Sequence, residues 1–216
     1  FQTGLLAKAN RGYLYIDEVN LLEDHLVDLL LDVAQSGENV VEREGLSIRH
    51  ASRFILIGSG NPEEGELRPQ LLDRFGLSVE VLTPDTVDER IEVIKRRDDY
   101  DKNPDEYAET WVKENRKLRN KIQKARKSLA SITVDSKILE HCAQICIDLG
   151  SDGLRGELTL VRTARALAAF NGKERVDVGH IKTIAPMALS HRLRRDPLDD
   201  AGSGTRVERS VQKIIG

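Results

Sequence analysis

The chain has 216 residues, of which 39% are hydrophobic and 32% are charged, and its formal net charge is −3. A chain of this length can bury the core of one or two domains, and its composition is typical of a soluble globular protein. The net charge gives no global attraction to nucleic acid or to an anionic membrane. No apolar run approaches the roughly 20 residues that a membrane-spanning helix needs.

The first part of the chain alternates short apolar runs with helical patterns. The predicted segments are a helix end at 5–10, a buried strand at 13–16, a helix at 23–36, a hairpin with charged arms at 39–50, a second buried strand at 54–57, a short helix at 69–74 and a third strand at 79–82. Alternating strands and helices predict an α/β fold with a parallel sheet and right-handed crossovers.

Beyond Pro84 the pattern becomes helical throughout. Residues 95–127 mix charges of both signs, which favours a solvated helix with i,i+4 ion pairs over a nucleic-acid patch. Apolar residues at helical spacing then predict a small all-α domain, with a flexible hinge at 199–204 and a short terminal helix. The predicted helices of this domain are 133–149, 154–170 and 178–193.

The two cysteines, Cys142 and Cys146, lie one helical turn apart on an apolar face. This position favours core packing over metal binding, and it predicts no disulfide framework. Free cysteines of this kind indicate a reducing, intracellular compartment.

Adjacent carboxylates follow the first predicted strand. Asp17 and Glu18 come directly after Tyr13-Leu14-Tyr15-Ile16, which places them at the carboxyl edge of the sheet, where open α/β sheets bind ligands. In nucleotide hydrolysis the first such carboxylate holds Mg²⁺, usually through water, and the second orients and activates the attacking water. A helix cap or a solvated turn is the alternative interpretation.

The second buried strand also ends in a polar residue. Asn61 follows it in Gly-Ser-Gly-Asn-Pro, where its side chain can hydrogen-bond a water or a γ-phosphate. An ordinary Asn-Pro turn is the alternative. The position beside Asp17 and Glu18 favours the functional interpretation.

Three stretches together resemble the ATPase subunits of magnesium chelatase, a branch of the AAA+ family. They are NVVEREGLSIRH (39–50), GSGNPEEGELRPQLLDRFGLSVEV (58–81) and GLRGELTLVRTARALA (153–168), and the resemblance runs from Gly4 to about Arg195. It implies a partial AAA+ P-loop core over 1–84, with hairpin 39–50 as the pre-sensor insertion. A charged helical linker over 85–130 and an all-α lid domain with a flexible C-terminal tail over 131–216 would follow.

The resemblance also assigns roles to individual residues. It makes Asp17 and Glu18 the Walker B pair, Asn61 the first sensor, Arg74 the arginine finger for a neighbouring subunit, and Arg155 the second sensor on the lid. A guanidinium at the charge that develops on the γ-phosphoryl group is worth roughly 10³–10⁵ in rate. The local alternatives are ion pairs of Arg74 with Asp73 or Glu66 and of Arg155 with Glu157, and Arg68 is a further finger candidate.

One departure from the family pattern is important. The sequence contains no G-x-x-x-x-G-K-[ST] motif, so the phosphate-binding loop and the first two strands of the core are expected upstream of Phe1. The printed chain alone is therefore expected to bind ATP weakly.

The resemblance implies an ATP-driven motor that assists insertion of Mg²⁺ into protoporphyrin IX during chlorophyll synthesis. ATP and Mg²⁺ are the implied cofactors, and the implied partners are further copies in a hexameric ring, a larger integrin-domain subunit and a porphyrin-binding catalytic subunit. Neither nucleic acid nor a membrane span is expected, and the expected compartment is cyanobacterial cytoplasm or chloroplast stroma. The alternatives are a MoxR-like AAA+ chaperone and a non-hydrolysing scaffold.

Overall fold

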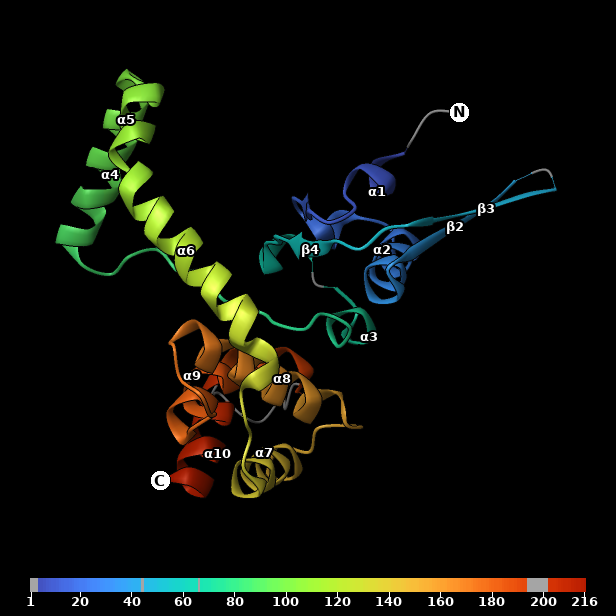
Figure 1. Cartoon of the computed structure of the whole chain (residues 1–216), viewed down its shortest axis with the longest axis vertical. Helices are drawn as coiled ribbons and strands as arrows, with labels where there is room; N and C mark the ends of the chain where they lie inside the picture. Colours follow the sequence, from blue (N-terminus) through green and yellow to red (C-terminus); the bar gives the residue numbers. More distant parts are fainter. Residues whose placement is uncertain (1–3, 44, 66, 194–201) are drawn as a thin grey trace. The chain divides into compact units, whose positions relative to one another are not determined.

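The computed structural model describes residues 4–43, 45–65, 67–193 and 202–216. The chain divides into two compact units, Phe1–Gly76 and Leu77–Gly216, which are described separately (Figure 1). The first unit contains α1 (Leu5–Lys8), β1 (Tyr13–Ile16), η1 (Val19–Leu21), α2 (Asp24–Ser36), β2 (Glu38–Arg43), β3 (Leu46–Ala51), β4 (Ile55–Gly58), η2 (Pro62–Glu64) and α3 (Pro69–Leu72), where η denotes a 3₁₀ helix. The second contains α4 (Val87–Lys102), α5 (Pro104–Thr110), α6 (Val112–Ser128), η3 (Leu129–Ser131), α7 (Ser136–Asp148), α8 (Arg155–Phe170), α9 (Val178–Leu189), η4 (Ser190–Arg192) and α10 (Ser203–Ile215).

The first unit is built on a parallel pair of strands. β1 and β4 pair from Tyr13↔Ile55 to Ile16↔Gly58, and the connection between them contains α2 and the antiparallel β2–β3 hairpin. Leu14 and Phe54 are buried with residues of α1 and α2 in one small apolar cluster. Together with the helical lid described below, this arrangement confirms the predicted α/β fold with a pre-sensor hairpin.

The strands of this pair are buried on one face only. Tyr13, Tyr15, Ile55 and Ile57 expose 71%, 60%, 57% and 44% of their surface, although the apolar runs predicted fully buried strands. The difference arises because, within the part of the chain that the structure describes, the apolar side chains of α2 pack against the other face alone. An exposed apolar surface of this kind marks a contact with another segment or molecule.

The predicted third strand at 79–82 is wrong. The segment is irregular, and Val79 and Val81 are 62% and 89% exposed. A strand requires a neighbour to accept its backbone hydrogen bonds, and the described residues offer none here. The preceding Ser78 instead donates its backbone N–H to the carbonyl of Met187 on α9, at 2.9 Å, so the segment begins the second unit.

The second unit has one extensive core, formed by α7 to α10. The fully buried residues of this core come from all four helices: Ile145 (α7), Leu160 (α8), Ile181 and Leu189 (α9) and Val207 (α10). α4, α5 and nearly all of α6 contribute no buried residue, and α6 joins the core through Ala125. Within the described residues, no helix is both long and apolar enough to cross a membrane.

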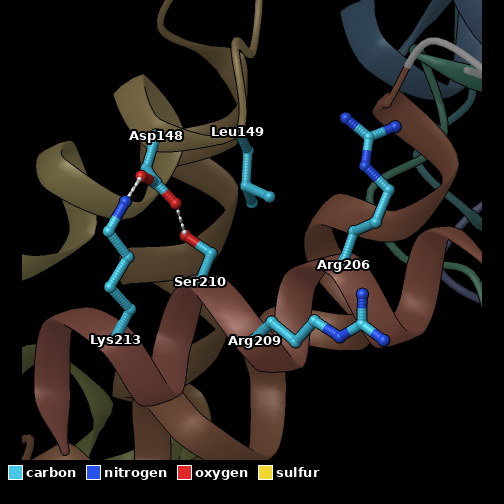
Figure 2. Close-up of a pocket in the computed structure, with 6 residues that line it drawn as sticks. All are labelled: Asp148, Leu149, Arg206, Arg209, Ser210 and Lys213. Atoms are coloured by element: carbon cyan, nitrogen blue, oxygen red, sulfur yellow. Dashed lines mark hydrogen bonds and ion pairs between the residues drawn. The ribbon is translucent and has the colours of Figure 1, made fainter. Parts of the chain in front are cut away.

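The C-terminal segment is a docked helix, which confirms the predicted short terminal helix, whereas the prediction of a flexible tail is wrong for residues 203–215. The predicted hinge lies partly on residues 199–201, outside the described residues. Val207 and Val211 of α10 are buried, and Asp148 at the end of α7 accepts hydrogen bonds from Ser210 (2.7 Å) and Lys213 (2.5 Å), as Figure 2 shows. Apolar residues one helical turn apart, which the sequence interpretation did not weigh, explain the docking.

Both cysteines lie in the core of the second unit. Cys142 and Cys146 are each 1% exposed, and burial raises their thiol pKa values to about 11 and about 12. The thiols are therefore protonated at neutral pH. Among the described residues there is no cluster of three or more His, Cys, Asp or Glu side chains suited to a metal ion.

Leu160→Ala tests the core of the second unit. Leu160 is fully buried on α8, so its truncation is expected to lower the free energy of unfolding by about 2–5 kcal/mol. Leu158, on the same helix, is 52% exposed, and Leu158→Ala is the matched control, expected to change stability by less than about 0.5 kcal/mol. Denaturant unfolding followed by circular dichroism measures both, and equal effects would contradict the assigned core.

Candidate active site

The carboxyl ends of β1 and β4 form the candidate active site. The strand register Ile16↔Gly58 continues into the turns, where Ser59 donates its N–H to the carbonyl of Ile16 (3.0 Å) and accepts the N–H of Val19 (2.8 Å). This pairing brings residues about 40 positions apart in sequence to the same sheet edge. Asp17 and Glu18 therefore lie beside the segment 59–61.

The hydroxyl of Ser59 is the centre of the hydrogen-bond network at this edge. It donates to Oδ1 of Asp17 at 2.5 Å and accepts the backbone N–H of Glu18 at 3.2 Å. The Tyr15 hydroxyl lies 3.1 Å from Ser59 Oγ and 3.0 Å from Asp17 Oδ1, so it can donate to either. One serine thus holds the side chain of the first carboxylate and the backbone of the second.

This network stabilises the ionised form of Asp17. Hydrogen bonds from Ser59, and then from Tyr15, lower the pKa of the Asp17 carboxyl below its ordinary value. The side chain remains exposed to solvent. The carboxylate is therefore charged and accessible at neutral pH.

Glu18 has a left-handed backbone conformation, with φ 50° and ψ 50°. Such a conformation costs a non-glycine residue free energy, and it is enriched at functional sites. It directs the chain from the end of β1 into η1, while the N–H of Glu18 bonds to Ser59. The backbone strain is thus located at Glu18, the second of the two acidic residues.

Two glycines allow the β4 end to approach the β1 turn. A Cβ on Gly58 would lie 2.8 Å from Cγ1 of Val19, and one on Gly60 would lie 2.7 Å from Oδ1 of Asn20. Both distances are shorter than side chains tolerate. The motif Gly-Ser-Gly-Asn is therefore required for packing at this edge as well as for any chemistry.

Asn61 lies at the same edge, and its side chain caps a short helix. Its Oδ1 accepts the backbone N–H of Glu63 at 3.1 Å, at the start of η2. Asn20 donates its side-chain N–H to the carbonyls of Asn61 (3.3 Å) and Gly65 (3.1 Å), which ties η2 to the β1 turn. The turn interpretation of Asn61 thus describes its observed bonds, and a role toward a phosphate stays a prediction.

Arg74 follows α3 and contacts α2. Its Nη1 donates to Oδ1 of Asp28 at 2.8 Å and to Oδ1 of Asp32 at 2.9 Å, and its side chain is 33% exposed. The ion pairs found for Arg74 are thus with α2, whereas the local alternative to its finger role had paired it with Asp73 or Glu66. Glu66 lies outside the described residues.

Arg68 makes a similar contact one turn earlier on α2. Its Nε lies 2.5 Å from Oδ2 of Asp24. Asp24 is four residues before the first carboxylate that binds Arg74, so a stripe of acidic residues on α2 holds both candidate arginines.

Arg155 belongs to the second unit, where it is the first residue of α8. It is exposed, and Gly153, two residues earlier, has a left-handed φ of 71°. Its role as the second sensor stays a prediction.

The residues at the sheet edge fit a magnesium ion. Mg²⁺ prefers hard oxygen ligands and usually keeps several waters, and Asp17 offers an exposed, ionised carboxylate. The chain contains no glycine-rich phosphate-binding motif. Asp17 could therefore hold a magnesium ion at this edge, and no motif of the chain supplies a phosphate cradle.

Several residues of this site were missed at the sequence level. Ser59 and Tyr15 carry no motif of their own, but parallel pairing with Ile16 opposite Gly58 places residue 17 opposite residue 59. The spacing of Tyr15 and Asp17 also places both on one face of the strand. The acidic stripe on α2 could have been found from its i,i+4 spacing.

Comparisons with known proteins agree with this architecture. Residues 139–214 match the family model of the AAA lid domain. A crystal structure of a Cytophaga hutchinsonii protein assigned as an ATPase matches with a TM-score of 0.67 at 20% identity, covering 94% of this chain and 65% of that one. The fold is thus that of part of a AAA+ module, an α/β core followed by a helical lid.

Curated relatives define the branch. The Cereibacter sphaeroides protein named magnesium-chelatase 38 kDa subunit is 67% identical over 215 residues, and the chloroplastic magnesium-chelatase subunit ChlI of Nicotiana tabacum is 54% identical over 215 residues. Both alignments cover the whole chain, which spans 64% and 50% of the respective relatives. The whole chain is thus similar to a part of these magnesium-chelatase subunits.

Ser59→Ala tests the network. Removal of the largest contribution to the lowered Asp17 pKa is expected to raise that pKa toward its ordinary value, so Asp17 binds its proton at a higher pH than in the parent. Stability that depends on the Asp17 carboxylate is present above its unfolded-state pKa and is lost as pH falls through the folded pKa. The pH-dependent loss of stability should therefore be smaller in the variant and should be complete at a higher pH than in the parent.

Carboxyl ¹³C NMR titration of Asp17 measures this shift. Ser47→Ala is the matched control, because Ser47 is an exposed serine on β3 that bonds only to Glu42 among the described residues. Superimposable titration curves for Ser59→Ala and the parent would contradict the assigned hydrogen bond.

Proposed function

We propose that this chain is the main part of an ATP-hydrolysing motor subunit of magnesium chelatase, which drives Mg²⁺ insertion into protoporphyrin IX. The observation that carries the proposal is the convergence of Asp17, Glu18 and Asn61 at one sheet edge, with Ser59 bonded to the Asp17 carboxylate and to the Glu18 backbone. The fraction of the relatives' length that the chain spans leaves room for a phosphate-binding loop elsewhere in the subunit. The exposed apolar face of β1 and β4 is a suitable packing surface for that part.

In this proposal the two carboxylates have separate roles. Asp17 would hold Mg²⁺ through water, and the ion would neutralise charge on the β- and γ-phosphates. Glu18 would orient the attacking water and accept its proton. The fixed backbone at Glu18 supports this role, because a catalytic base must be held in position relative to the atom it activates.

Arg74 would act on the nucleotide of a neighbouring subunit. Within the described part of the chain, its side-chain hydrogen bonds to Asp28 and Asp32 both use Nη1. The N–H groups of Nε and Nη2 are therefore left for a phosphate. Asp28 and Asp32 would then orient the arginine rather than neutralise it. Asn61 would contact the water or the γ-phosphate, and Arg155 would act from the lid.

The proposal implies a defined set of partners. They are further copies of the subunit in a ring, a larger integrin-domain subunit and a porphyrin-binding catalytic subunit, in bacterial cytoplasm or chloroplast stroma. ATP hydrolysis by the full-length subunit separates a motor from a scaffold. Magnesium insertion with both partner subunits separates the chelatase from a MoxR-like chaperone.

Glu18→Gln in the full-length subunit is expected to keep nucleotide binding and to lower the turnover of ATP by about 10²–10⁴-fold. The amide preserves the size of the side chain and removes its ability to accept a proton. Glu64→Gln, an exposed carboxylate in η2, is the matched control. Steady-state ATPase and calorimetric nucleotide binding measure the two effects, and unchanged turnover would remove Glu18 from the mechanism.

Arg74→Ala is expected to fold and bind nucleotide but to hydrolyse it poorly, because no guanidinium reaches the neighbouring site. Mixing it with Glu18→Gln subunits tests action in trans. Some interfaces then combine an intact Glu18 with an intact Arg74, so part of the ATPase activity should return. If rings containing both variants form without any recovery, Arg74 serves only its ion pairs with α2.

A further inference from the structure

The second unit contains a preformed helical arm, α4–α6. Tyr107 packs against Tyr100 with ring centroids 6.0 Å apart and against Trp111 at 6.2 Å, and the Arg96 guanidinium lies 5.3 Å from the Trp111 ring. These contacts join α4 and α5 to the start of α6, as Figure 1 shows for the helices. The arm therefore has a fixed shape without burying a core of its own.

The last helix of the arm carries a strong positive charge. α6 contains eight lysine or arginine residues and one glutamate, a net charge of +7. Six of the cations follow the i, i+3, i+4 spacing of one helix face, while Leu118, Ile122 and Ala125 lie on the opposite face. We call these six the basic stripe: Lys113, Arg116, Lys117, Lys121, Lys124 and Lys127. The stripe is about 21 Å long at 1.5 Å per residue.

The cations of the basic stripe contribute few contacts to the fold. On α4, Arg96, Arg97 and Lys102 pair with carboxylates of the same helix. In the stripe, by contrast, Lys117 pairs with Glu114 and Lys121 stacks on a ring of α8, and the other four have no ion pair with any described residue. The prediction of a solvated helix with i,i+4 ion pairs therefore holds for α4, whereas α6 is solvated but has a single, i,i+3 ion pair among the described residues.

An acidic segment precedes the stripe. Residues 98–109, which we call the acidic tip, contain six carboxylates and one lysine, a net charge of −5. A single residue, Trp111, separates α5 from α6, so the chain cannot fold α5 back along the stripe of the same molecule. Two of its carboxylates, Asp98 and Asp101, pair with Lys102 and Arg97 on α4. The other four have no ion pair with any described residue and are complementary in charge to the stripe: Asp99, Asp105, Glu106 and Glu109.

We propose that the basic stripe binds the acidic tip of a second copy, in a head-to-tail contact. Contacts of this kind join different surfaces of successive copies and close into rings when the rotation permits. The inference rests on the proposed function, because it assumes the ring of subunits that this function requires. Because the chain has a net charge of −3 and α6 has +7, the remaining residues carry −10, which disfavours extended polyanions such as nucleic acid.

Charge reversal in the full-length subunit tests the contact. The stripe variant is Lys113→Glu with Lys124→Glu, and the tip variant is Asp99→Lys with Glu109→Lys, all at exposed positions. The matched control is Arg119→Glu with Arg126→Glu, which makes the same charge change on α6 outside the stripe. Circular dichroism checks folding, and sedimentation velocity with nucleotide measures self-assembly.

Each variant alone is expected to assemble about tenfold more weakly than the parent, since two opposed charge pairs become repulsive. The control should assemble like the parent. An equimolar mixture of the two variants should recover, because the unchanged tip of the first meets the unchanged stripe of the second. At the other contact, the two lysines introduced in the tip of the second meet the two glutamates introduced in the stripe of the first. High salt should weaken both the parent and the mixture.

Parent-like assembly of either variant overturns the proposal, as does failure of the folded variants to recover on mixing. It is also overturned if the stripe captures a polyglutamate peptide or duplex DNA while reversal leaves self-assembly unchanged. The readout is independent of catalysis, since the variants keep Asp17, Glu18 and Asn61. Loss of the proposed ATPase function would therefore appear as inactive rings, whereas failure of this contact would appear as unchanged rings.

Discussion

The hydrogen bond from Ser59 to Asp17 is the interaction on which the candidate site depends. It joins residues 42 positions apart and holds the Asp17 carboxylate at the edge of the strand pair, while the same hydroxyl accepts the backbone N–H of Glu18. The parallel register sets its geometry, and Gly58 and Gly60 provide the space for it. The chemistry assigned to the site therefore depends on backbone packing as directly as on the carboxylates.

The two units differ in the amount of apolar contact that each contains. The first relies on small clusters around α2, and one face of its strand pair is open. The second encloses one large core, which α6 joins through Ala125 and α10 joins through Val207 and Val211. Local opening should therefore be easier in the first unit, which carries the carboxylates, than in the second.

The sequence predicted those features that short-range patterns determine. Apolar runs identified β1 and β4, and charged arms around Glu44-Gly45 identified the hairpin, because each signal lies within a few residues. The run at 79–82 resembled β1 and β4, but strand formation depends on a partner that local sequence does not specify. Likewise, Asp17 and Glu18 could be recognised from a strand end.

Features that depend on tertiary placement were not accessible in the same way. Arg74 contacts α2 rather than its sequence neighbours, since the position of α3 determines which carboxylates it reaches. Ser59 required the register of a strand pair separated by a helix and a hairpin. The functional roles of Asp17, Glu18, Asn61, Arg74 and Arg155 stay predictions for the same reason, because each concerns a group bound outside this chain.

The buried thiols of Cys142 and Cys146 have a practical consequence for studies of this protein. Maleimides react with accessible thiolates, and neither side chain supplies one at neutral pH. A cysteine introduced at an exposed position, such as Arg119 on α6 or Leu158 on α8, would accept a fluorophore selectively. Site-specific fluorescence labelling can thus proceed in the natural background, with both native cysteines retained.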